Sequence, residues 1–339
     1  MGCTYKILRG EDLETVVPSN QKFALDVLIG LSEKPKQLSS MYFYDDTGSR
    51  LFQKIMALPE YYLTSCEMEI IKTQTEQFSN LVGDGTFHLI ELGAGDGSKT
   101  SVLIDHFLQK KLEFDYIPID ISEAAMKTLL RSMGKKFETL SANGLVAEYF
   151  DGLKWISQSK HKRNMVLMLG SNLGNFNKAR ARVFLRSLWN SLNNGDYVVI
   201  GFDLKKDIEI MLRAYNDSQG VTEKFNLNLL RRINTELGGQ FDLNKFRFYA
   251  NYNVFSGAIE SFLVSLEPQR IYIAQLGDYF EFDAWEPIHT EYSYKFLESD
   301  ISLLAEQTGY RIVHQLYDSK RYFVDSIWRV EKLEATAHK

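Results

Sequence analysis

The sequence predicts a doubly wound α/β fold, a parallel sheet with helices on both faces, that ends in an antiparallel hairpin. Between residues 87 and 204, short apolar runs alternate with stretches of helical periodicity. The runs are continuous rather than alternating in polarity, which is typical of parallel strands buried on both faces. Near the end of the chain, a helical stretch is followed by two more apolar runs, and these predict the hairpin.

The first part of the chain, from about residue 18 to residue 80, reads as helices. In the stretch LTSCEMEIIK, Thr64 is followed three residues later by Glu67, ahead of an apolar-periodic run. This spacing is that of a capping box, in which the two side chains satisfy the first backbone N–H groups of a helix. It therefore predicts a helix that begins at Thr64.

Four apolar runs provide the expected strands of the parallel sheet, and helical stretches connect them. The strands are FHLIELG, FDYIPIDI, NMVLMLG and DYVVIGFDL, and the helices include KTSVLIDHFLQKK and ARVFLRSLWNSL. After residue 204 this alternation stops. Residues 205–257 read as mostly helical, and residues 259–283 read as two long strands paired with one another, AIESFLVSL and RIYIAQLGDYFEF.

The α/β pattern returns in the last part of the chain. FLESDISLLAEQTG predicts a helix, and YRIVHQLYD with YFVDSIWRV predicts the closing hairpin. We therefore assign residues 63–204 and 295–335 to a nucleotide-binding core. Residues 1–62 and 205–294 are expected to form a second, substrate-binding lobe.

Length, charge and cysteine content exclude several classes of protein. At 339 residues the chain is long for one domain, which agrees with a core and a second lobe. A net charge of −5 provides no basic field for nucleic acid, and no apolar run is long enough to cross a membrane. The two cysteines suit a reducing cytoplasm, and with the six histidines they show no metal-binding spacing. We expect a cytoplasmic, monomeric protein without a metal.

The loop ELGAGDGSKT, residues 91–100, comes close to two nucleotide-binding signatures. It departs from both the phosphate loop and the dinucleotide fingerprint at Ser98, where each would need glycine. Glu91 and Asp96 would repel a polyphosphate unless a metal ion intervened. S-adenosylmethionine carries a sulfonium and an ammonium and no phosphate, so nearby acids favour it. We therefore interpret the loop as a site for S-adenosylmethionine.

Asp120 and the closing hairpin support this interpretation. Asp120 ends the second predicted strand, where a carboxylate in many nucleotide-binding folds accepts hydrogen bonds from both ribose hydroxyls. A final helix followed by a hairpin resembles the end of the class I S-adenosylmethionine-dependent methyltransferases, which have a Rossmann-like core. The simpler alternative is that the glycines serve only a tight turn from strand to helix.

Five ordered motifs extend the resemblance to nearly the whole chain, from about residue 18 to residue 332. They are YFYDDTGSRLFQKIMALPEYYLTSCEMEII, ELGAGDGSKT, LGSNLGNF, AYNDSQGVTEKFN and HTEYSYKF. Together they resemble the histidine-specific methyltransferase family. Founding members of that family make hercynine, the trimethylated betaine of histidine in ergothioneine biosynthesis. The resemblance implies an N-methyltransferase with S-adenosyl-L-methionine as methyl donor.

The resemblance also implies which residues contact the methyl donor. They are Gly93, Lys99, Asp120, Glu148, Tyr149, Gly170 and Ser171. Glu148 and Tyr149 correspond to an acid and an aromatic residue beside the adenine, although the best-known members carry aspartate in place of Glu148. Gly170 and Ser171 correspond to the end of a strand that meets both ligands.

A second set, implied in the same way, contacts the amino-acid substrate. It comprises Tyr44, Tyr61, Asn175, Tyr215, Glu291 and Ser293. Asn175 corresponds to a residue that holds the substrate near its carboxylate, and Tyr44 to a tyrosine near the amine. Glu291 and Ser293 correspond to the pair that contacts the imidazole. A carboxylate can accept one ring N–H, and a hydroxyl can serve the other ring nitrogen.

These residues also have ordinary structural interpretations. Tyr61 and Tyr215 could be packing residues. Asn175 could cap the helix that follows it, and Glu291 could be a solvated strand residue. Ser261 stands where the best-known histidine enzymes carry a methionine beside the substrate ring. Another aromatic amino acid, such as the prenylated tryptophan that fungal relatives methylate, is therefore an alternative substrate. A nicotinamide enzyme and a non-catalytic binding protein are further alternatives.

The chemistry of methyl transfer agrees with these residue types. The protein must deliver a neutral amine lone pair to the methyl group in near-attack geometry. An amino-acid amine is largely protonated near pH 7, so a proton must leave before each transfer. Tyr44, or a water that it orients, is the candidate acceptor. Three transfers leave a quaternary ammonium, which the rings of Tyr44 and Tyr61 could contact through their faces.

Overall fold

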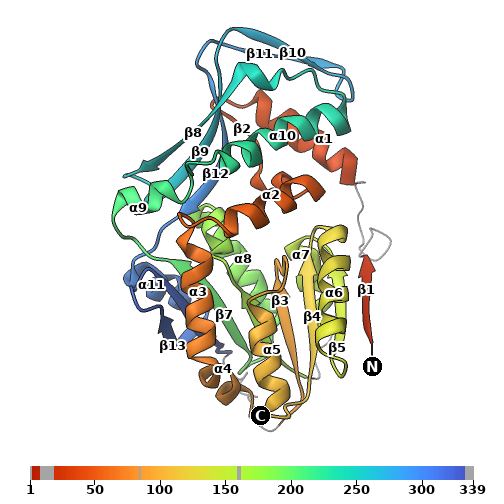
Figure 1. Ribbon diagram of the computed structural model, residues 1–339, viewed down its shortest axis with the longest axis vertical. Coiled ribbons are helices and arrows are strands. Elements are labelled where there is room, and N and C mark those ends of the chain that lie inside the picture. The colour runs from red at the N-terminus through yellow and green to blue at the C-terminus, as the bar shows by residue number, and fades with distance from the viewer. Residues whose placement is uncertain (1, 8–18, 84, 159–161, 333–339) are drawn as a thin grey trace, which may run out of the picture. The chain divides into compact units, whose positions relative to one another are not determined.

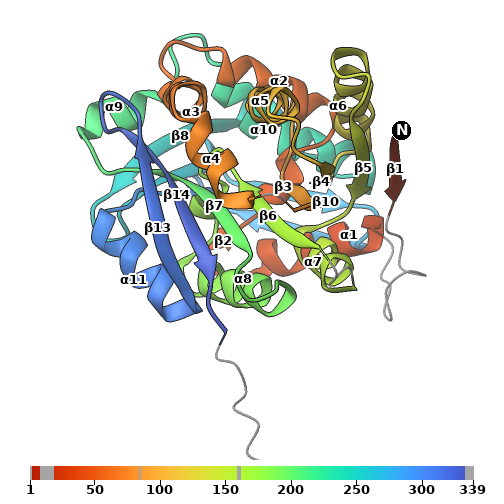
Figure 2. The ribbon, with the colours of Figure 1, turned by 90° about the horizontal axis from the view of Figure 1, so that it is seen from below.

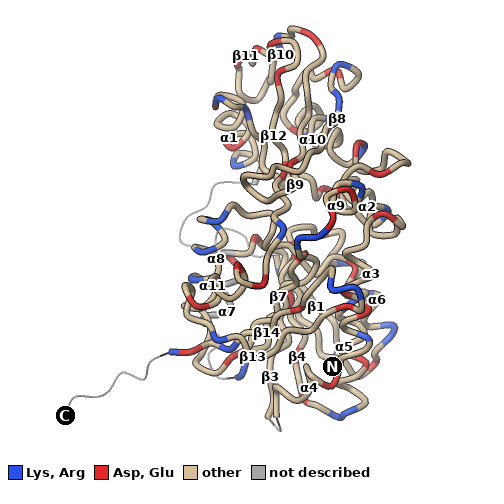
Figure 3. Tube along the Cα trace, turned by 90° about the vertical axis from the view of Figure 1, so that its left-hand side faces the viewer, with Lys and Arg blue, Asp and Glu red and all other residues tan. Residues whose placement is uncertain are grey.

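The computed structural model describes residues 2–7, 19–83, 85–158 and 162–332. These residues form two compact units. The first, which we call the core unit, contains residues 2–7, 63–205 and 296–332, and the second unit contains residues 19–62 and 206–295. Basic and acidic residues are interspersed along both units (Figure 3). No described helix combines the length and the apolar character that a membrane span requires.

An eight-stranded sheet organises the core unit. Its order is β1 (Cys3–Ile7), β5 (Ser141–Val146), β4 (Phe114–Asp120), β3 (Phe87–Leu92), β6 (Arg163–Met168), β7 (Tyr197–Asp203), β14 (Phe323–Val330) and β13 (Tyr310–Tyr317). All neighbours from β1 to β7 pair in parallel, and β14 pairs antiparallel with both β7 and β13. The chain order reverses between β3 and β6, so the loops that follow these strands flank a topological switch point.

Helices cover both faces of this sheet (Figure 2). One face carries α3 (Tyr62–Thr73), α4 (Thr75–Val82), α5 (Thr100–Gln109) and α6 (Glu123–Lys136). The other carries α7 (Tyr149–Gln158), α8 (Lys178–Ser191) and α11 (Glu298–Thr308). The apolar side chains of α8, such as Phe184 and Leu188, are completely buried against Ile90 and Val198 of the strands. The doubly wound fold with its closing hairpin is therefore confirmed.

Two strands of the sheet were not among the predicted runs. β5 has the sequence SANGLV, whose serine, asparagine and glycine weaken the apolar signal of a buried strand. β1 pairs in parallel with β5 at the edge of the sheet. Residues 3–7 therefore belong to the core unit, although we had placed everything before residue 63 in the other lobe. An edge strand has one solvated side, so its composition carries little of the core pattern.

The capping-box prediction is wrong. The helix α3 begins at Tyr62, so Thr64 already lies within its first turn. Glu67 is fully buried and accepts hydrogen bonds from the backbone of Gly170 instead of from the start of its own helix. The spacing of Thr64 and Glu67 is compatible with a capping box and also with a buried glutamate. The hydrogen bond to Gly170, more than a hundred residues along the chain, shows that Glu67 has the second role.

The second unit combines helices with two small sheets (Figure 1). Its helical elements are α1 (Ser19–Ser32), η2 (Ser40–Phe43), α2 (Asp46–Met56), α9 (Ile208–Arg213), α10 (Val221–Leu237) and η4 (Leu243–Lys245). A four-stranded sheet has the order β2 (Lys36–Gln37), β12 (Pro287–Tyr294), β9 (Ala258–Ser265) and β8 (Phe246–Asn253). The hairpin of β10 (Gln269–Ile273) and β11 (Asp278–Phe282) stands apart from it.

The strand pairing expected within residues 259–283 is wrong. β9 pairs with β8 and β12, whereas the run RIYIAQLGDYFEF folds back on itself as β10 and β11. Gly277 adopts a φ of 65°, a conformation that favours glycine, in the turn between them. Residues 246–253, expected as part of a mostly helical region, form β8 with every second side chain buried at its start. That alternation, Phe246, Phe248 and Ala250, was visible in the sequence.

Candidate functional site

In the glycine loop after β3, the space beside Gly93 is occupied by neighbouring side chains, and the space beside Gly95 is open. Gly93 has a φ of 74°, and a Cβ there would lie 2.6 Å from the Tyr149 hydroxyl and 3.0 Å from Nδ2 of Asn172. Gly95 has a φ of 53°, and a Cβ there would meet nothing within 4 Å. Both glycines are thus required by backbone conformation, and the loop has open space beside Gly95.

Glu91 links the glycine loop to the start of α5 and to β4. Its carboxyl is buried and accepts hydrogen bonds of 2.5 Å from the hydroxyls of Thr100 and Tyr116. Burial raises the pKa of Glu91 to about 7, and the two hydrogen bonds oppose that shift. Glu91 therefore faces the interior of the core unit. The sequence places Glu91 among the acids that favour a cationic ligand, whereas its buried carboxyl bonds to Thr100 and Tyr116 and has a structural role.

Asp120 ends β4, as predicted, and its carboxylate is oriented by the backbone. One oxygen accepts the N–H of Ser122 at 2.9 Å, and the other accepts the N–H of Gly95 at 3.0 Å. Burial raises the pKa of Asp120, and these backbone hydrogen bonds oppose the shift. Each oxygen keeps a second lone pair, so the carboxylate can still accept hydrogen bonds from a diol such as ribose.

Glu148 and Tyr149 follow β5 at the same edge of the sheet, where Tyr149 begins α7. The Tyr149 ring packs against Phe184 with ring centroids 5.8 Å apart and against Phe176 at 6.4 Å. Burial raises the pKa of Tyr149, so its hydroxyl stays neutral at pH 7. An acid and an aromatic residue therefore follow β5, and these are the residue types that the resemblance implies beside the adenine.

The loop after β6 contains the next candidate residues. Gly170 and Ser171 have φ values of 77° and 58°, and the Ser171 hydroxyl accepts the N–H of Asp203 at 3.2 Å. Asn175 ends the short helix η3 (Asn172–Asn175). The N-cap of α8 is Asn177, whose side chain accepts the N–H of Arg180, so the interpretation of Asn175 as that cap is wrong.

Lys99 lies at the N-terminal end of α5 and forms an ion pair with Glu67 of α3. Both Glu67 oxygens also accept the N–H of Gly170, at 2.8 and 2.9 Å. Burial alone would lower the pKa of Lys99, but Glu67 beside it prevails and the pKa is raised. Sequence reasoning missed Glu67. It shares a helix face with buried Leu63, Ile70 and Ile71, and that apolar periodicity was the available signal.

In the second unit, aromatic rings gather around Phe52. Tyr44 contacts Phe52 edge to face at 5.6 Å between ring centroids, and Tyr61 contacts it at 6.1 Å. Tyr61 also contacts Tyr215 at 6.1 Å, and Tyr44 contacts Phe225 at 5.7 Å. The structure therefore brings all three predicted substrate tyrosines into one aromatic cluster.

The strand β12 places Glu291 and Ser293 on one face, with Lys295 just beyond its end. The Tyr215 and Ser293 hydroxyls lie 2.6 Å apart, and the buried Lys295 ammonium donates to them at 3.0 and 2.9 Å respectively. Burial raises the pKa of Glu291 to about 7, and Lys295 opposes that shift. Lys295 was missed because a lysine near a strand end is usually solvated.

Ser261 lies directly opposite Glu291 in the pairing of β9 with β12. Residues directly opposite one another in an antiparallel pair share a face of the sheet, so the small Ser261 side chain lies beside the Glu291 carboxyl. Both face away from Glu260, the neighbour of Ser261 on β9.

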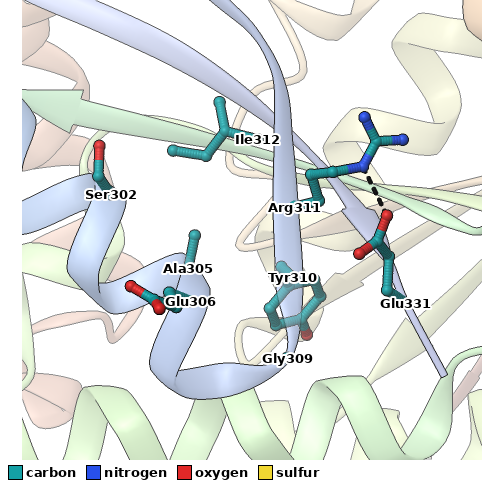
Figure 4. A pocket seen from close by; sticks show the side chains of 8 residues that line it. All are labelled: Ser302, Ala305, Glu306, Gly309, Tyr310, Arg311, Ile312 and Glu331. Carbon is teal, nitrogen blue, oxygen red and sulfur yellow. Dashed lines mark hydrogen bonds and ion pairs between the residues drawn. The ribbon is translucent and has the colours of Figure 1, made fainter. Parts of the chain in front are cut away.

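A separate pocket lies at the opposite edge of the core sheet, where β13 begins (Figure 4). It is lined by Ser302, Ala305, Glu306, Gly309, Tyr310, Arg311, Ile312 and Glu331, and an ion pair of 2.5 Å joins Arg311 to Glu331. Tyr310 pairs with Val330, and the preceding residue Arg329 pairs with Tyr197 at the start of β7. The pocket is therefore remote from the loops that follow β3, β4 and β6.

A doubly wound sheet that closes with an antiparallel hairpin, with a glycine loop and an aspartate after its first two central strands, is the architecture of a class I S-adenosylmethionine-dependent methyltransferase. The model of the histidine-specific, S-adenosylmethionine-dependent methyltransferase family matches residues 23–330, and the chain belongs to that family. Its methyl donor is S-adenosyl-L-methionine.

Three relatives illustrate the relationship. The chain is 34% identical to a histidine N-alpha-methyltransferase of Mycolicibacterium smegmatis, over 85% of this chain and 89% of that one. It is 33% identical to the histidine N-alpha-methyltransferase of Mycobacterium tuberculosis, over 80% and 83% of the two chains. It is also 31% identical to ergothioneine biosynthesis protein 1 of Neurospora crassa, over 66% of this chain and 25% of that one.

Proposed function

We propose that this protein transfers methyl groups from S-adenosylmethionine to the α-amino group of L-histidine, three times, and so produces hercynine for ergothioneine biosynthesis. The names of the first two relatives support this substrate, and the name of the third supports the pathway. The observation that supports it most directly is the pair formed by Glu291 and Ser293 on one strand face. A half-buried carboxylate beside a hydroxyl suits the two nitrogens of an imidazole.

We assign the methyl donor to Gly93, Lys99, Asp120, Glu148, Tyr149, Gly170 and Ser171. The oriented carboxylate of Asp120 would accept hydrogen bonds from the ribose hydroxyls, and the open space beside Gly95 would let the ligand approach the backbone. Lys99 would pair with the carboxylate of the donor's amino-acid portion. Tyr149 would pack against the adenine. These loops contribute binding and orientation, since a methyl sulfonium is already an activated donor.

We assign the amino-acid substrate to Tyr61, Asn175, Tyr215, Glu291 and Ser293, with Tyr44 near the amine. The amine must lose a proton before each in-line attack on the methyl carbon. Tyr44, or a water held by its hydroxyl, is the proposed acceptor. The aromatic cluster around Phe52 suits the product, because a quaternary ammonium cannot donate hydrogen bonds but is attracted to ring faces.

A different aromatic amino acid is the second candidate substrate, and Ser261 is the observation that favours it. A serine opposite Glu291 leaves more room than the methionine of the best-known histidine enzymes. A bulkier ring could then occupy the same face of β9 and β12.

Mass spectrometry distinguishes these candidates. The purified protein is incubated with S-adenosylmethionine and a mixture of the twenty common amino acids. A histidine product that has gained three methyl groups supports the proposal, and methylation of tryptophan or tyrosine in its place supports the second candidate. Binding of S-adenosylmethionine without any S-adenosylhomocysteine formed would indicate a non-catalytic protein.

Glu291→Ala tests the proposed imidazole contact. A site built to accept a substrate N–H discriminates strongly against analogues without one, by as much as about 10⁴-fold in favourable cases. The variant should therefore lose most of its kcat/KM for histidine while its activity toward phenylalanine or tryptophan changes little or rises. Glu260→Ala is the matched control, because Glu260 lies on the other face of the same sheet and bonds to Asn253 and Ser256. Wild-type histidine activity in Glu291→Ala would place the imidazole elsewhere.

A further inference from the structure

Three ionisable side chains meet in the core unit, and one of them, Asp325, has no role in the site described above. Glu67 comes from α3, Lys99 from the start of α5 and Asp325 from β14. Glu67 and Asp325 are both completely buried. The Glu67 carboxyl receives two donors, the Lys99 ammonium and the backbone N–H of Gly170, which both carboxyl oxygens share.

The pairing of β7 with β14 places the Asp325 carboxyl next to that of Glu67. Asp325 lies directly opposite Gly201, so the two residues share a face of the sheet. A Cβ built on Gly201 would lie only 2.3 Å from Oε1 of Glu67, which shows that the Glu67 carboxyl rests on this face. Gly201 leaves the space in which the two carboxyls approach one another.

The buried Asp325 carboxyl receives no hydrogen bond from the described residues. A buried, ionised carboxylate without donors is very unfavourable, and two adjacent carboxylates cannot both ionise easily. Burial, with Glu67 as the next cause, raises the pKa of Asp325 well above its usual range, although Lys99 opposes the shift. A proton on Asp325 would remove this cost, and the neighbouring Glu67 carboxyl is positioned to accept it in a hydrogen bond.

We propose that Glu67 and Asp325 form a carboxylate–carboxylic acid pair that positions the Lys99 ammonium for the carboxylate of the methyl donor. Glu67 and Asp325 are positioning residues, because they act through Lys99 and through the backbone of Gly170. The inference rests on the assignment of Lys99 to the donor in the proposed function.

The charges of the cluster explain why a proton is needed. One lysine and one carboxylate balance, whereas a second ionised carboxylate would leave a net negative charge where an anion must bind. A further acidic neighbour of Lys99 is Glu91, on β3, which is bonded to Thr100 and Tyr116. The ammonium has three N–H donors, and Glu67 occupies one of them, so donors remain for the ligand. Gly170 keeps the space next to the ammonium open, since a Cβ there would lie 3.4 Å from Nζ.

A comparison of two ligands tests the role of Glu67. S-adenosylhomocysteine carries the amino-acid carboxylate, and 5′-methylthioadenosine has the same adenosine without it. In Glu67→Gln, an amide N–H would face the donors of Lys99 or Gly170. Calorimetry should then show S-adenosylhomocysteine binding about tenfold weaker or more, with 5′-methylthioadenosine changed by less than about twofold. Equal losses for both ligands, or no loss for either, would overturn the proposal.

Two further variants distinguish a general loss of stability from a specific effect on binding of the ligand carboxylate. Asp196→Asn is the matched control, because Asp196 is equally buried and accepts three hydrogen bonds at the opposite edge of the same sheet. It should lower stability without changing the ratio of the two affinities. Lys99→Met should change that ratio. If Lys99→Met leaves the ratio at its wild-type value, the assignment of Lys99 fails; if only Glu67→Gln leaves it there, the assignment stands and the positioning role fails.

The pH dependence of ligand affinity tests the shared proton directly. This measurement also tests the proposal if Glu67→Gln does not fold. As pH rises through the raised pKa of Asp325, the wild type should lose affinity for S-adenosylhomocysteine, because a second negative charge appears beside Lys99. Asp325→Asn cannot ionise, so the ratio of wild-type to variant dissociation constants should grow with pH. Titration of the ligand and of Lys99 cancels in this ratio. A ratio that stays constant with pH would refute the shared proton.

Discussion

Asp120 is held by N–H groups from two different loops, its own and the glycine loop. Such pre-orientation lets the carboxylate bind a diol without losing further conformational freedom. Asp120→Ala should therefore weaken S-adenosylmethionine binding by about 1.5–3 kcal/mol, the range for hydrogen bonds to a charged group. Calorimetry measures this directly.

Asp115 provides the control for that experiment. It lies on the same strand, five residues earlier, and pairs with Lys162 at 2.7 Å. Asp115→Ala should leave the affinity for S-adenosylmethionine unchanged. An Asp120→Ala variant that folds and binds like the wild type would show that the ribose lies elsewhere.

Glu291 should leave a signature in the pH dependence of stability. Burial raises its pKa from 4.5 to about 7 in the folded state, against the pull of Lys295. Between these pH values the folded chain binds more protons than the unfolded chain, so this residue's stabilising contribution, complete below about pH 4.5, is lost as pH rises through about 7. Urea denaturation across this range should show a shallower loss of stability in Glu291→Gln than in the wild type.

Glu260→Gln, which changes a buried glutamate on the opposite face, is the control for replacing a glutamate of this sheet by its amide. The explanation fails if Glu291→Gln and the wild type lose stability in parallel over the whole range.

At the scale of elements, the contact between β7 and α3 depends on one missing side chain. Gly201 lies in the middle of β7, and a Cβ there would meet Glu67 at 2.3 Å and the Phe323 ring at 2.9 Å. Gly201→Ala should therefore lower the free energy of unfolding by about 1–3 kcal/mol, the usual cost of overpacking a core. It should also weaken binding of S-adenosylhomocysteine, since the Glu67 carboxyl would have to move. Chemical denaturation and calorimetry measure the two effects.

Gly85→Ala is the control, because a Cβ at Gly85 would meet nothing within 4 Å. Its free energy of unfolding should stay within about 0.5 kcal/mol of the wild type. Equal stability of the two variants would mean that α3 and β7 can separate without cost.

At the scale of the whole molecule, the candidate residues divide between the two units. The proposed cofactor residues and Asn175 belong to the core unit, and Tyr61 and Tyr215 belong to the second unit. Tyr61→Phe and Asn175→Ala should raise the KM for the amino acid, because each removes a substrate contact. Their dissociation constants for S-adenosylmethionine should stay within about twofold of the wild type. Steady-state kinetics and calorimetry on the same preparations check both statements.

If both variants lost cofactor affinity as strongly as substrate affinity, these residues would shape the fold instead of the substrate site. The comparison is informative because one of the two lies in the unit that carries the cofactor loops and the other does not.

Several features of the molecule could be predicted because they depend on residues that are close together in the sequence. A strand buried on both faces must be apolar along its length, so β3, β4, β6 and β7 were visible as continuous runs. Carboxyl ends of parallel strands meet at one edge, so the glycine loop and Asp120 could be expected together, and Gly95 does bond to Asp120. The edge strand β1 and the polar strand β5 lacked this signal.

The sequence by itself thus determined the fold class, the family and the methyl donor, since these depend on periodicity and on ordered motifs. Only the tertiary structure decided what Glu67 does, because a capping box and a buried ion pair look the same over four residues. Glu67 bonds to a residue 103 positions away, and Asp325 meets it only because β14 pairs with β7 at Gly201. Lys295 likewise bonds to Tyr215, 80 residues earlier. Such contacts depend on how distant segments pack, and local composition carries no record of that packing.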